Sequence, residues 1–115
     1  MNMPVQNMEK LQYIGYPAGG FFREHEDYIE GRCVTFFCYL DDLSENCGGE
    51  TFFPTLKLKI RPQRGMAIMF PNGPKNADCA KKLDKWRYNL LKHEGCLTTV
   101  PKRILALIGR ISTKK

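Results

Sequence analysis

The chain contains two histidines, and their positions constrain the fold more than any other feature. His25 lies in the triplet His25-Glu26-Asp27, and His93 follows far downstream. Two imidazoles and one carboxylate on one face of an ion are typical of mononuclear non-haem Fe(II) sites, which leave the opposite face open. Residues two apart on a strand point the same way, so His25 and Asp27 can bind one ion. His93 must then come from a strand that is distant in sequence and adjacent in space.

Short apolar segments separated by turn residues predict a β-rich chain. The segment 33–40 is apolar, β-branched and aromatic, and it is too short for a helix, so we expect a central strand there. Further strands are expected at 11–16, 21–27, 51–53, 56–60, 66–70, 97–100 and 103–111, with polar loops at 41–49 and 71–85. This pattern favours an all-β sandwich or barrel. A two-sheet roll would bring the two histidines together at one mouth.

Composition indicates one globular domain. The 115 residues are 43% hydrophobic and 11% aromatic, which excludes a disordered chain and leaves room for one core. We read residues 1–10 as a short lead and residues 11–115 as the domain. The net charge of +6 is spread thinly, without a block of like charges or a nucleic-acid motif. A solvated basic surface is therefore favoured over nucleic-acid binding.

The cysteines and the chain ends bear on the compartment. The five cysteines are odd in number and include no Cys-x-x-Cys pair, which argues against a zinc knuckle and a fully paired disulfide framework. Cys47 and Cys79 lie in polar loops and could pair. Residues 1–10 contain no apolar run of the kind found in signal peptides, and no stretch approaches the length of a membrane span. We expect a cytoplasmic protein by default, or an endoplasmic reticulum protein if the N-terminus is incomplete.

Five motifs follow one another in order along the chain. They are Tyr16-x-x-Gly19-x-x-Phe22-x-x-His25-x-Asp27, Arg32-x-x-Thr35-x-x-x-Tyr39-Leu40, Gly48-Gly49-Glu50-Thr51-x-Phe53-Pro54, Pro62-x-x-Gly65-x-Ala67-x-x-Phe70 and His93-Glu94-Gly95. Together they resemble the catalytic core of prolyl 4-hydroxylase-like dioxygenases, which use Fe(II) and 2-oxoglutarate. The resemblance covers about residues 11–111. It implies a jelly-roll core, also called a double-stranded β-helix, with few helices.

The resemblance also implies roles for seven residues. His25, Asp27 and His93 correspond to the iron ligands and form the catalytic centre. The family places a lysine ten positions after the distal histidine to bind the far carboxylate of 2-oxoglutarate, and here that position is Arg103. An arginine can neutralise a carboxylate with two parallel hydrogen bonds. The other cosubstrate-binding candidates are Lys102, which has the opposite strand parity, and the hydroxyl groups of Tyr16 and Thr51.

The activity implied is hydroxylation of a C–H bond, most simply of a peptidyl proline, with O2 consumed and succinate and CO2 released. L-ascorbate is expected to keep the iron reduced, and a protein or peptide is the expected substrate. The chain departs from the family at Pro101 and Ile104, where a glycine and a tryptophan are usual. Two alternatives stay open. One is a non-catalytic remnant of the same fold, and the other is a cupin-like metal protein that does not use 2-oxoglutarate.

Overall fold

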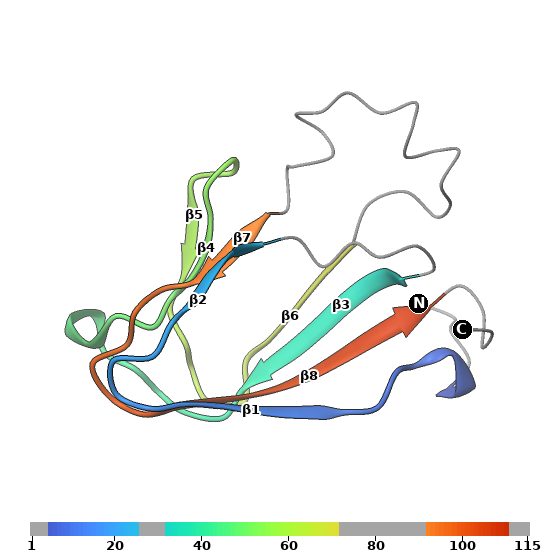
Figure 1. Cartoon of the computed structure of the whole chain (residues 1–115), viewed down its shortest axis with the longest axis horizontal. Helices are drawn as coiled ribbons and strands as arrows, with labels where there is room; N and C mark the ends of the chain where they lie inside the picture. Colours follow the sequence, from blue (N-terminus) through green and yellow to red (C-terminus); the bar gives the residue numbers. More distant parts are fainter. Residues whose placement is uncertain (1–4, 26–31, 72–91, 111–115) are drawn as a thin grey trace.

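The computed structural model describes residues 5–25, 32–71 and 92–110 (Figure 1). These residues form eight strands and two short 3-10 turns, and they contain no α-helix. The turns are η1 (Val5–Asn7) and η2 (Glu45–Cys47). The strands are β1 (Gln12–Tyr16), β2 (Phe22–His25), β3 (Arg32–Tyr39), β4 (Thr51–Phe53), β5 (Leu58–Ile60), β6 (Ala67–Pro71), β7 (His93–Gly95) and β8 (Lys102–Arg110). Within the described part, no helix has the length and apolar character that crossing a membrane requires.

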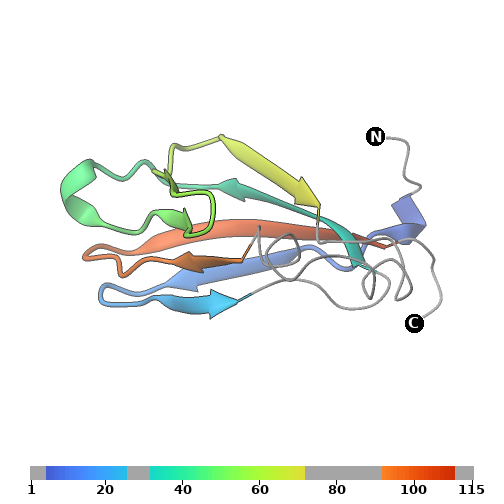
Figure 2. The same ribbon diagram turned by 90° about the horizontal axis from the view of Figure 1, so that it is seen from above.

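The strands form two four-stranded antiparallel sheets. Sheet A has the order β1-β8-β3-β6, and sheet B has the order β2-β7-β4-β5. Strands from both ends of the chain are neighbours in each sheet, as β1 and β8 are in sheet A. Figures 1 and 2 show the short strands of sheet B lying over one end of the longer sheet A. This interleaved two-sheet arrangement is the jelly roll that the sequence predicts.

Alternation along the central strands of sheet A produces the core. On β3, Phe37 and Tyr39 are buried while Phe36 on the same strand is exposed. On β8, Ile104 and Ala106 are buried in the same way. These side chains pack with two aromatic residues of neighbouring strands, and the whole cluster consists of Phe37, Tyr39, Phe53, Phe70, Ile104 and Ala106. The period of two therefore separates an inner face, which faces sheet B, from an outer face.

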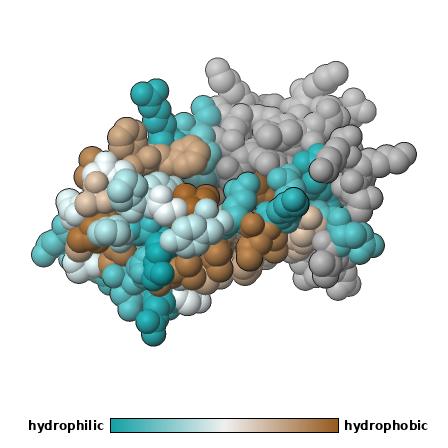
Figure 3. All heavy atoms as spheres, turned by 60° about the horizontal axis from the view of Figure 1, so that its bottom comes forward, coloured by the Kyte–Doolittle hydropathy of each residue, from teal (hydrophilic) through white to brown (hydrophobic). Residues whose placement is uncertain are grey.

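The outer face of sheet A is also apolar. The strand registers place one row of paired residues across all four strands, which consists of Tyr13, Leu105, Cys38 and Ala67. The next row contains Leu107, Phe36 and Met69. Tyr13 is 62% exposed and Met69 is 55% exposed. Figure 3 shows the resulting band of apolar side chains between hydrophilic groups. Cys38 thus lies half-buried on this face, outside the core.

Most of the expected strands are confirmed, and one is wrong. The strand at 51–53 is found with its predicted limits, and the central strand is β3. Residues 97–100 form no strand, because Thr98 makes only an isolated bridge to Gly48. The strand expected at 56–60 begins at Leu58, after a turn in which the amide of Lys57 donates to the carbonyl of Pro54. The expected loop at 71–85 and Cys79 lie outside the described residues, apart from Pro71 in β6.

Gly48 is the glycine whose replacement should cost most. Its φ is +69°, and a Cβ there would overlap the carbonyl oxygen of Leu97. We expect Gly48→Ala to lower the free energy of unfolding by roughly 3 kcal/mol or more. Two costs add up in this variant: the strain of a left-handed backbone conformation in a non-glycine residue, and the clash of the new Cβ with the backbone. Urea denaturation would measure the loss. Gly65→Ala is the control, since Gly65 also has a positive φ but nothing within 4 Å of the added Cβ; an equal loss in both variants would contradict the clash.

Candidate active site

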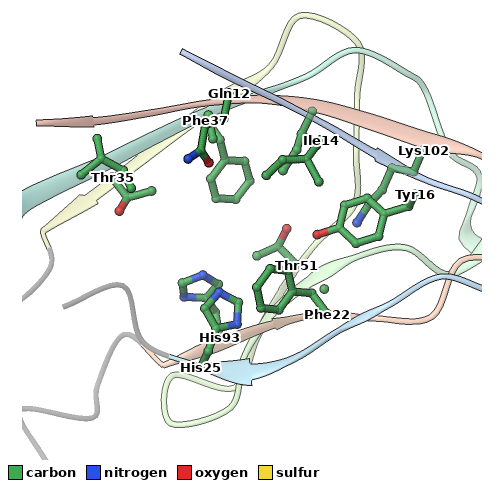
Figure 4. Close-up of a pocket in the computed structure, with 14 residues that line it drawn as sticks. Gln12, Ile14, Tyr16, Phe22, His25, Thr35, Phe37, Thr51, His93 and Lys102 are labelled. Atoms are coloured by element: carbon green, nitrogen blue, oxygen red, sulfur yellow. The ribbon is translucent and has the colours of Figure 1, made fainter. Parts of the chain in front are cut away.

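A cavity of about 300 Å³ lies between the two sheets. Its walls come from the inner face of sheet A and from β2, β4 and β7 of sheet B. Figure 4 shows Lys102 and Tyr16 at one end, Thr35 at the other, and the two histidines along one side. The wall between the two ends is apolar and includes Ile14, Phe37 and Ala106. A mainly apolar pocket with a few convergent polar groups is typical of small-ligand sites.

The two histidines lie side by side, as the spacing of the sequence predicts. His25 pairs with His93 in the register of β2 and β7, and their ring centroids are 4.3 Å apart. His25 Nδ1 lies 2.6 Å from the carbonyl oxygen of Arg23. Because a carbonyl only accepts, Nδ1 carries the proton and the lone pair of the neutral ring is on Nε2. This is the tautomer that a metal ligand requires when its other nitrogen donates to a carbonyl.

An irregularity in β2 places His25 on the cavity side. Phe22 and His25 are three residues apart, so in a regular strand their side chains would point to opposite faces. The register of β2 on β7 shifts between them, and both residues line the cavity. Their rings stack at 4.0 Å between centroids with a 31° tilt. A bulge that re-aims a side chain is a common device beside functional sites.

Asp27, the third expected ligand, lies outside the described residues. Strand β2 ends at His25 in the described part, so the expectation that His25 and Asp27 share a strand face stays a prediction. No cluster of three or more potential metal-binding residues occurs among the residues with defined placement. The structure thus brings together the two imidazoles of the expected set.

Lys102 is the basic residue that faces the cavity. Its side chain is 2% exposed, and its Nζ donates to the carbonyl oxygen of Gly49 at 3.0 Å. The same nitrogen lies 4.3 Å from the centre of the Tyr16 ring, since the two residues pair in the register of β1 and β8. No acidic side chain in the described part of the chain forms an ion pair with it. Burial lowers the pKa of Lys102 below its ordinary value.

The structure places Lys102, and not Arg103, in the lining of the cavity. Arg103 has the opposite parity on β8, and its side chain is 51% exposed. Its Nη2 donates to Asp41 Oδ1 at 2.7 Å, and its backbone amide donates to Asp41 Oδ2 at 2.9 Å. The hydrogen bond with Arg103 holds the pKa of Asp41 below its usual range. Arg103 is therefore committed to a surface ion pair, and the adjacent lysine occupies the cavity.

The two hydroxyl candidates both line the cavity. Thr51 is 5% exposed and its Oγ1 lies 2.6 Å from the hydroxyl of Tyr39, which is fully buried. Burial raises the pKa of Tyr39 to about 12, against the opposing hydrogen bond from Thr51. Burial also raises the pKa of Tyr16. Both phenols therefore stay neutral donors at physiological pH. The hydroxyls of Tyr16 and Thr51 lie near Lys102 in Figure 4.

Several further lining residues had no site role assigned from the sequence, among them Gln12, Phe22, Thr35 and Phe37. Strand parity could have found three of them. Gln12 is two residues from Ile14, and Thr35 and Phe37 share the parity of buried Tyr39. Phe22 required knowledge of the β2 irregularity, which no local pattern in the sequence indicates.

The stability of the ligand-free protein should rise with pH because of Lys102. Burial lowers its pKa in the folded state, so between that pKa and the ordinary lysine value of about 10.4 the unfolded chain binds more protons. Stability then increases with pH across this interval, and below it the contribution of Lys102 is independent of pH because the side chain is protonated in both states. Urea denaturation at several pH values, on wild type and Lys102→Met, would isolate the effect. A rise of the same size in Lys102→Met would contradict it.

Comparison with known proteins decides the family. Residues 11–108 match the sequence profile described as the 2OG-Fe(II) oxygenase superfamily. This chain belongs to that superfamily. The match includes every strand from β1 to β7 and most of β8, so it covers the cavity and its walls. The resemblance to prolyl 4-hydroxylase-like dioxygenases noted from the motifs is thereby confirmed.

Relatives of this chain include proteins named as prolyl 4-hydroxylases. It is 37% identical over 75 residues to probable prolyl 4-hydroxylase 11 of Arabidopsis thaliana, covering 59% of this chain and 26% of that protein. It is 28% identical over 115 residues to the chicken (Gallus gallus) prolyl 4-hydroxylase subunit alpha-1, covering 80% of this chain and 22% of that protein. The chain thus spans about a quarter of the length of these relatives.

A solved structure shares the fold. The viral collagen prolyl hydroxylase of Paramecium bursaria Chlorella virus-1, in complex with 2-oxoglutarate, superposes with a TM-score of 0.75 at 30% sequence identity. The superposition covers 92% of this chain and 61% of the viral one. A cupin from Desulfovibrio desulfuricans matches at a TM-score of 0.55 and 17% identity, covering 94% of this chain and 76% of the cupin, which indicates the fold alone.

The described residues fit Fe(II) and 2-oxoglutarate, the two groups for which the superfamily is named. The centroids of the two imidazole rings lie 4.3 Å apart. The neutral ring of His25 has its lone pair on Nε2, because Nδ1 lies next to a carbonyl oxygen. A buried ammonium group faces the same cavity from the other end, beside two neutral hydroxyl groups. The cavity volume of about 300 Å³ is at the small end of ligand pockets, which suits a short dicarboxylate.

Proposed function

We propose that this chain forms the catalytic core of an Fe(II)- and 2-oxoglutarate-dependent dioxygenase that hydroxylates a C–H bond, with a peptidyl proline as the substrate. The observation that carries the proposal is the buried ammonium group of Lys102 in one cavity with both histidines. Within the described part of the chain this ammonium group forms no ion pair, and burying a cation without one is costly, so such a site favours an anionic ligand. The proline assignment draws on the relatives, which are prolyl hydroxylases.

Each cavity residue has a task in this proposal. His25 and His93 hold Fe(II) together with Asp27. Lys102 neutralises the far carboxylate of 2-oxoglutarate, and Tyr16 and Thr51 donate hydrogen bonds to it. The contact between Tyr39 and Thr51 holds the threonine hydroxyl in place. The apolar wall keeps water away from the reacting groups.

When bound, Fe(II) supplies the redox chemistry that couples O2 and 2-oxoglutarate to hydroxylation, with release of succinate and CO2. L-ascorbate is proposed as the reductant that keeps the iron in its Fe(II) form. The substrate would bind beside the residues that hold the metal. The protein contributes binding, orientation and exclusion of water, because the cofactor and cosubstrate carry the difficult steps.

Succinate release tests this function. Purified chain is incubated with Fe(II), 2-oxoglutarate, ascorbate and a proline-rich peptide of collagen-like sequence, and succinate and peptide mass are followed. We expect succinate to depend on both Fe(II) and 2-oxoglutarate, and the peptide to gain one oxygen. His25→Ala is the inactive control. A folded sample without succinate formation, with or without peptide, would favour the non-catalytic remnant.

The cupin-like alternative makes a different prediction. A metal protein that does not use 2-oxoglutarate would bind Fe(II) with His25 and His93 and would show no affinity for 2-oxoglutarate in the presence of the metal. Metal binding without cosubstrate binding would therefore replace the dioxygenase proposal by this one.

A further inference from the structure

Among the described residues, three aromatic rings are in contact with the ring of His93. The centroid of Phe70 lies 5.0 Å away with an interplanar angle of 70°, and that of Phe53 lies 5.3 Å away at 43°. His25 is the third neighbour, at 4.3 Å and 62°. Phe53 and Phe70 also contact each other, with centroids 5.4 Å apart. These are the offset and edge-to-face geometries that aromatic pairs prefer.

The two phenylalanines come from different sheets. Phe53 is the last residue of β4 in sheet B, and Phe70 is on β6 in sheet A. They are 3% and 6% exposed, so the core holds each ring. His93 itself is 5% exposed and is the first residue of β7. A side chain at the very start of a short strand is oriented less by its own backbone than by the rings packed on it from both sheets.

We infer that Phe53 and Phe70 are positioning residues for His93, which set the direction of its imidazole toward the metal. The inference rests on the proposed function, since it concerns the same metal site. A ligand held within a narrow range of orientations binds without first losing rotational freedom. Leucine at either position keeps an apolar core but removes the flat ring that limits the imidazole, so metal affinity should fall.

Phe37 is a core ring that contacts Phe70 but not the imidazole of His93. It contacts Phe70 with centroids 6.1 Å apart and Tyr39 at 5.5 Å, and these ring contacts do not extend to His93. The cluster therefore contains an inner pair, Phe53 and Phe70, which touches the imidazole, and an outer ring, which supports the pair. Phe70 is also the last residue of the motif Pro62-x-x-Gly65-x-Ala67-x-x-Phe70. Its contact with the imidazole of His93 connects this motif to the metal site.

Co(II) titration tests the inference without any turnover. Co(II) alone is added to wild type, Phe70→Leu and Phe53→Leu, and both affinity and the visible absorption spectrum are recorded well below each unfolding temperature. We expect each leucine variant to bind Co(II) about tenfold more weakly, the lower end of the effect of groups that orient metal ligands. The absorption band should also broaden or shift. Phe70→Tyr, which keeps the ring, should stay near the wild-type affinity and spectrum.

Leu43→Ala is the matched control for stability. Leu43 is 5% exposed and lies in the loop before η2, apart from the cavity. The Leu43→Ala variant should lower the unfolding temperature as much as Phe70→Leu and Phe53→Leu do. Its Co(II) affinity and absorption spectrum should stay unchanged. If Phe70→Leu and Phe53→Leu bound Co(II) with the affinity and spectrum of Leu43→Ala, the positioning role of the two rings would be wrong. The proposed metal site would still stand. Wild type that binds no Co(II), or His93→Ala that binds it normally, would overturn the proposed metal site as well.

Discussion

Lys102→Met should weaken the binding of 2-oxoglutarate by about 100-fold or more, whereas Arg103→Ala should leave it unchanged. The two residues are adjacent in β8, but only Lys102 is buried at the end of the cavity. Without the ammonium group, one carboxylate of the cosubstrate would be buried without a countercharge. Breaking such a pair costs about 3–5 kcal/mol, which corresponds to a loss of affinity of roughly two to three and a half powers of ten.

Calorimetric titration of 2-oxoglutarate into the anaerobic Fe(II) protein would measure this difference. The loss in Lys102→Met cannot be ascribed to unfolding if the variant is as stable as wild type, and we expect it to be at least as stable. Methionine has a similar length and carries no buried charge, and replacing buried charges by apolar groups is often neutral or stabilising. A loss of affinity in Arg103→Ala with none in Lys102→Met would reverse the assignment.

His93→Ala should abolish metal binding in the micromolar range, a loss of more than about 100-fold. Its ring lies next to that of His25 in a buried position, and no third histidine exists in the chain to replace it. We expect His25→Ala to behave in the same way. The measurement is Fe(II) affinity under anaerobic conditions. Asp27→Ala belongs in the same series, because it tests the ligand that lies outside the described residues.

Met69→Ala provides the control for this series. Met69 is 55% exposed on the outer face of sheet A, where a change in the side chain leaves the cavity unaltered. Its Fe(II) affinity should match that of wild type. If His93→Ala retained the wild-type affinity as Met69→Ala does, the pair of imidazoles would not be a metal site.

The sequence was sufficient to predict the pairing of the two histidines and the strands around them in outline. Both rest on physical constraints that act locally: period-two alternation, turn residues and the ligand set of Fe(II). The central strand at β3 and the strand at 51–53 follow from the same alternation. The jelly roll itself was implied by the resemblance of the motifs to a known family. The pairing of β2 with β7 agrees with the separate expectation that His25 and His93 lie on neighbouring strands.

Whether Lys102 or Arg103 faces the cavity is decided by the register of β8. Counting ten positions from His93 selects Arg103, but position along the chain does not determine which face a side chain takes. The pairing of Tyr16 with Lys102 does determine it, because paired residues in neighbouring strands point the same way. Strand registers depend on contacts distant in sequence. The same reason explains the wrong strand at 97–100, where the backbone of Thr98 bonds with Gly19 and Gly20 and forms an isolated bridge with Gly48 but no continuous ladder.

Fe(II) and 2-oxoglutarate bound together in one site would produce a metal-to-ligand absorption band, which tests the proposed site without any substrate. Wild-type protein is titrated anaerobically with Fe(II) and then with 2-oxoglutarate, and the visible spectrum is recorded at each step. We expect a band that appears only when both are present and that is absent in His25→Ala. No band in folded wild-type protein, or a band that survives in His25→Ala, would contradict the assignment of this cavity as the cosubstrate site.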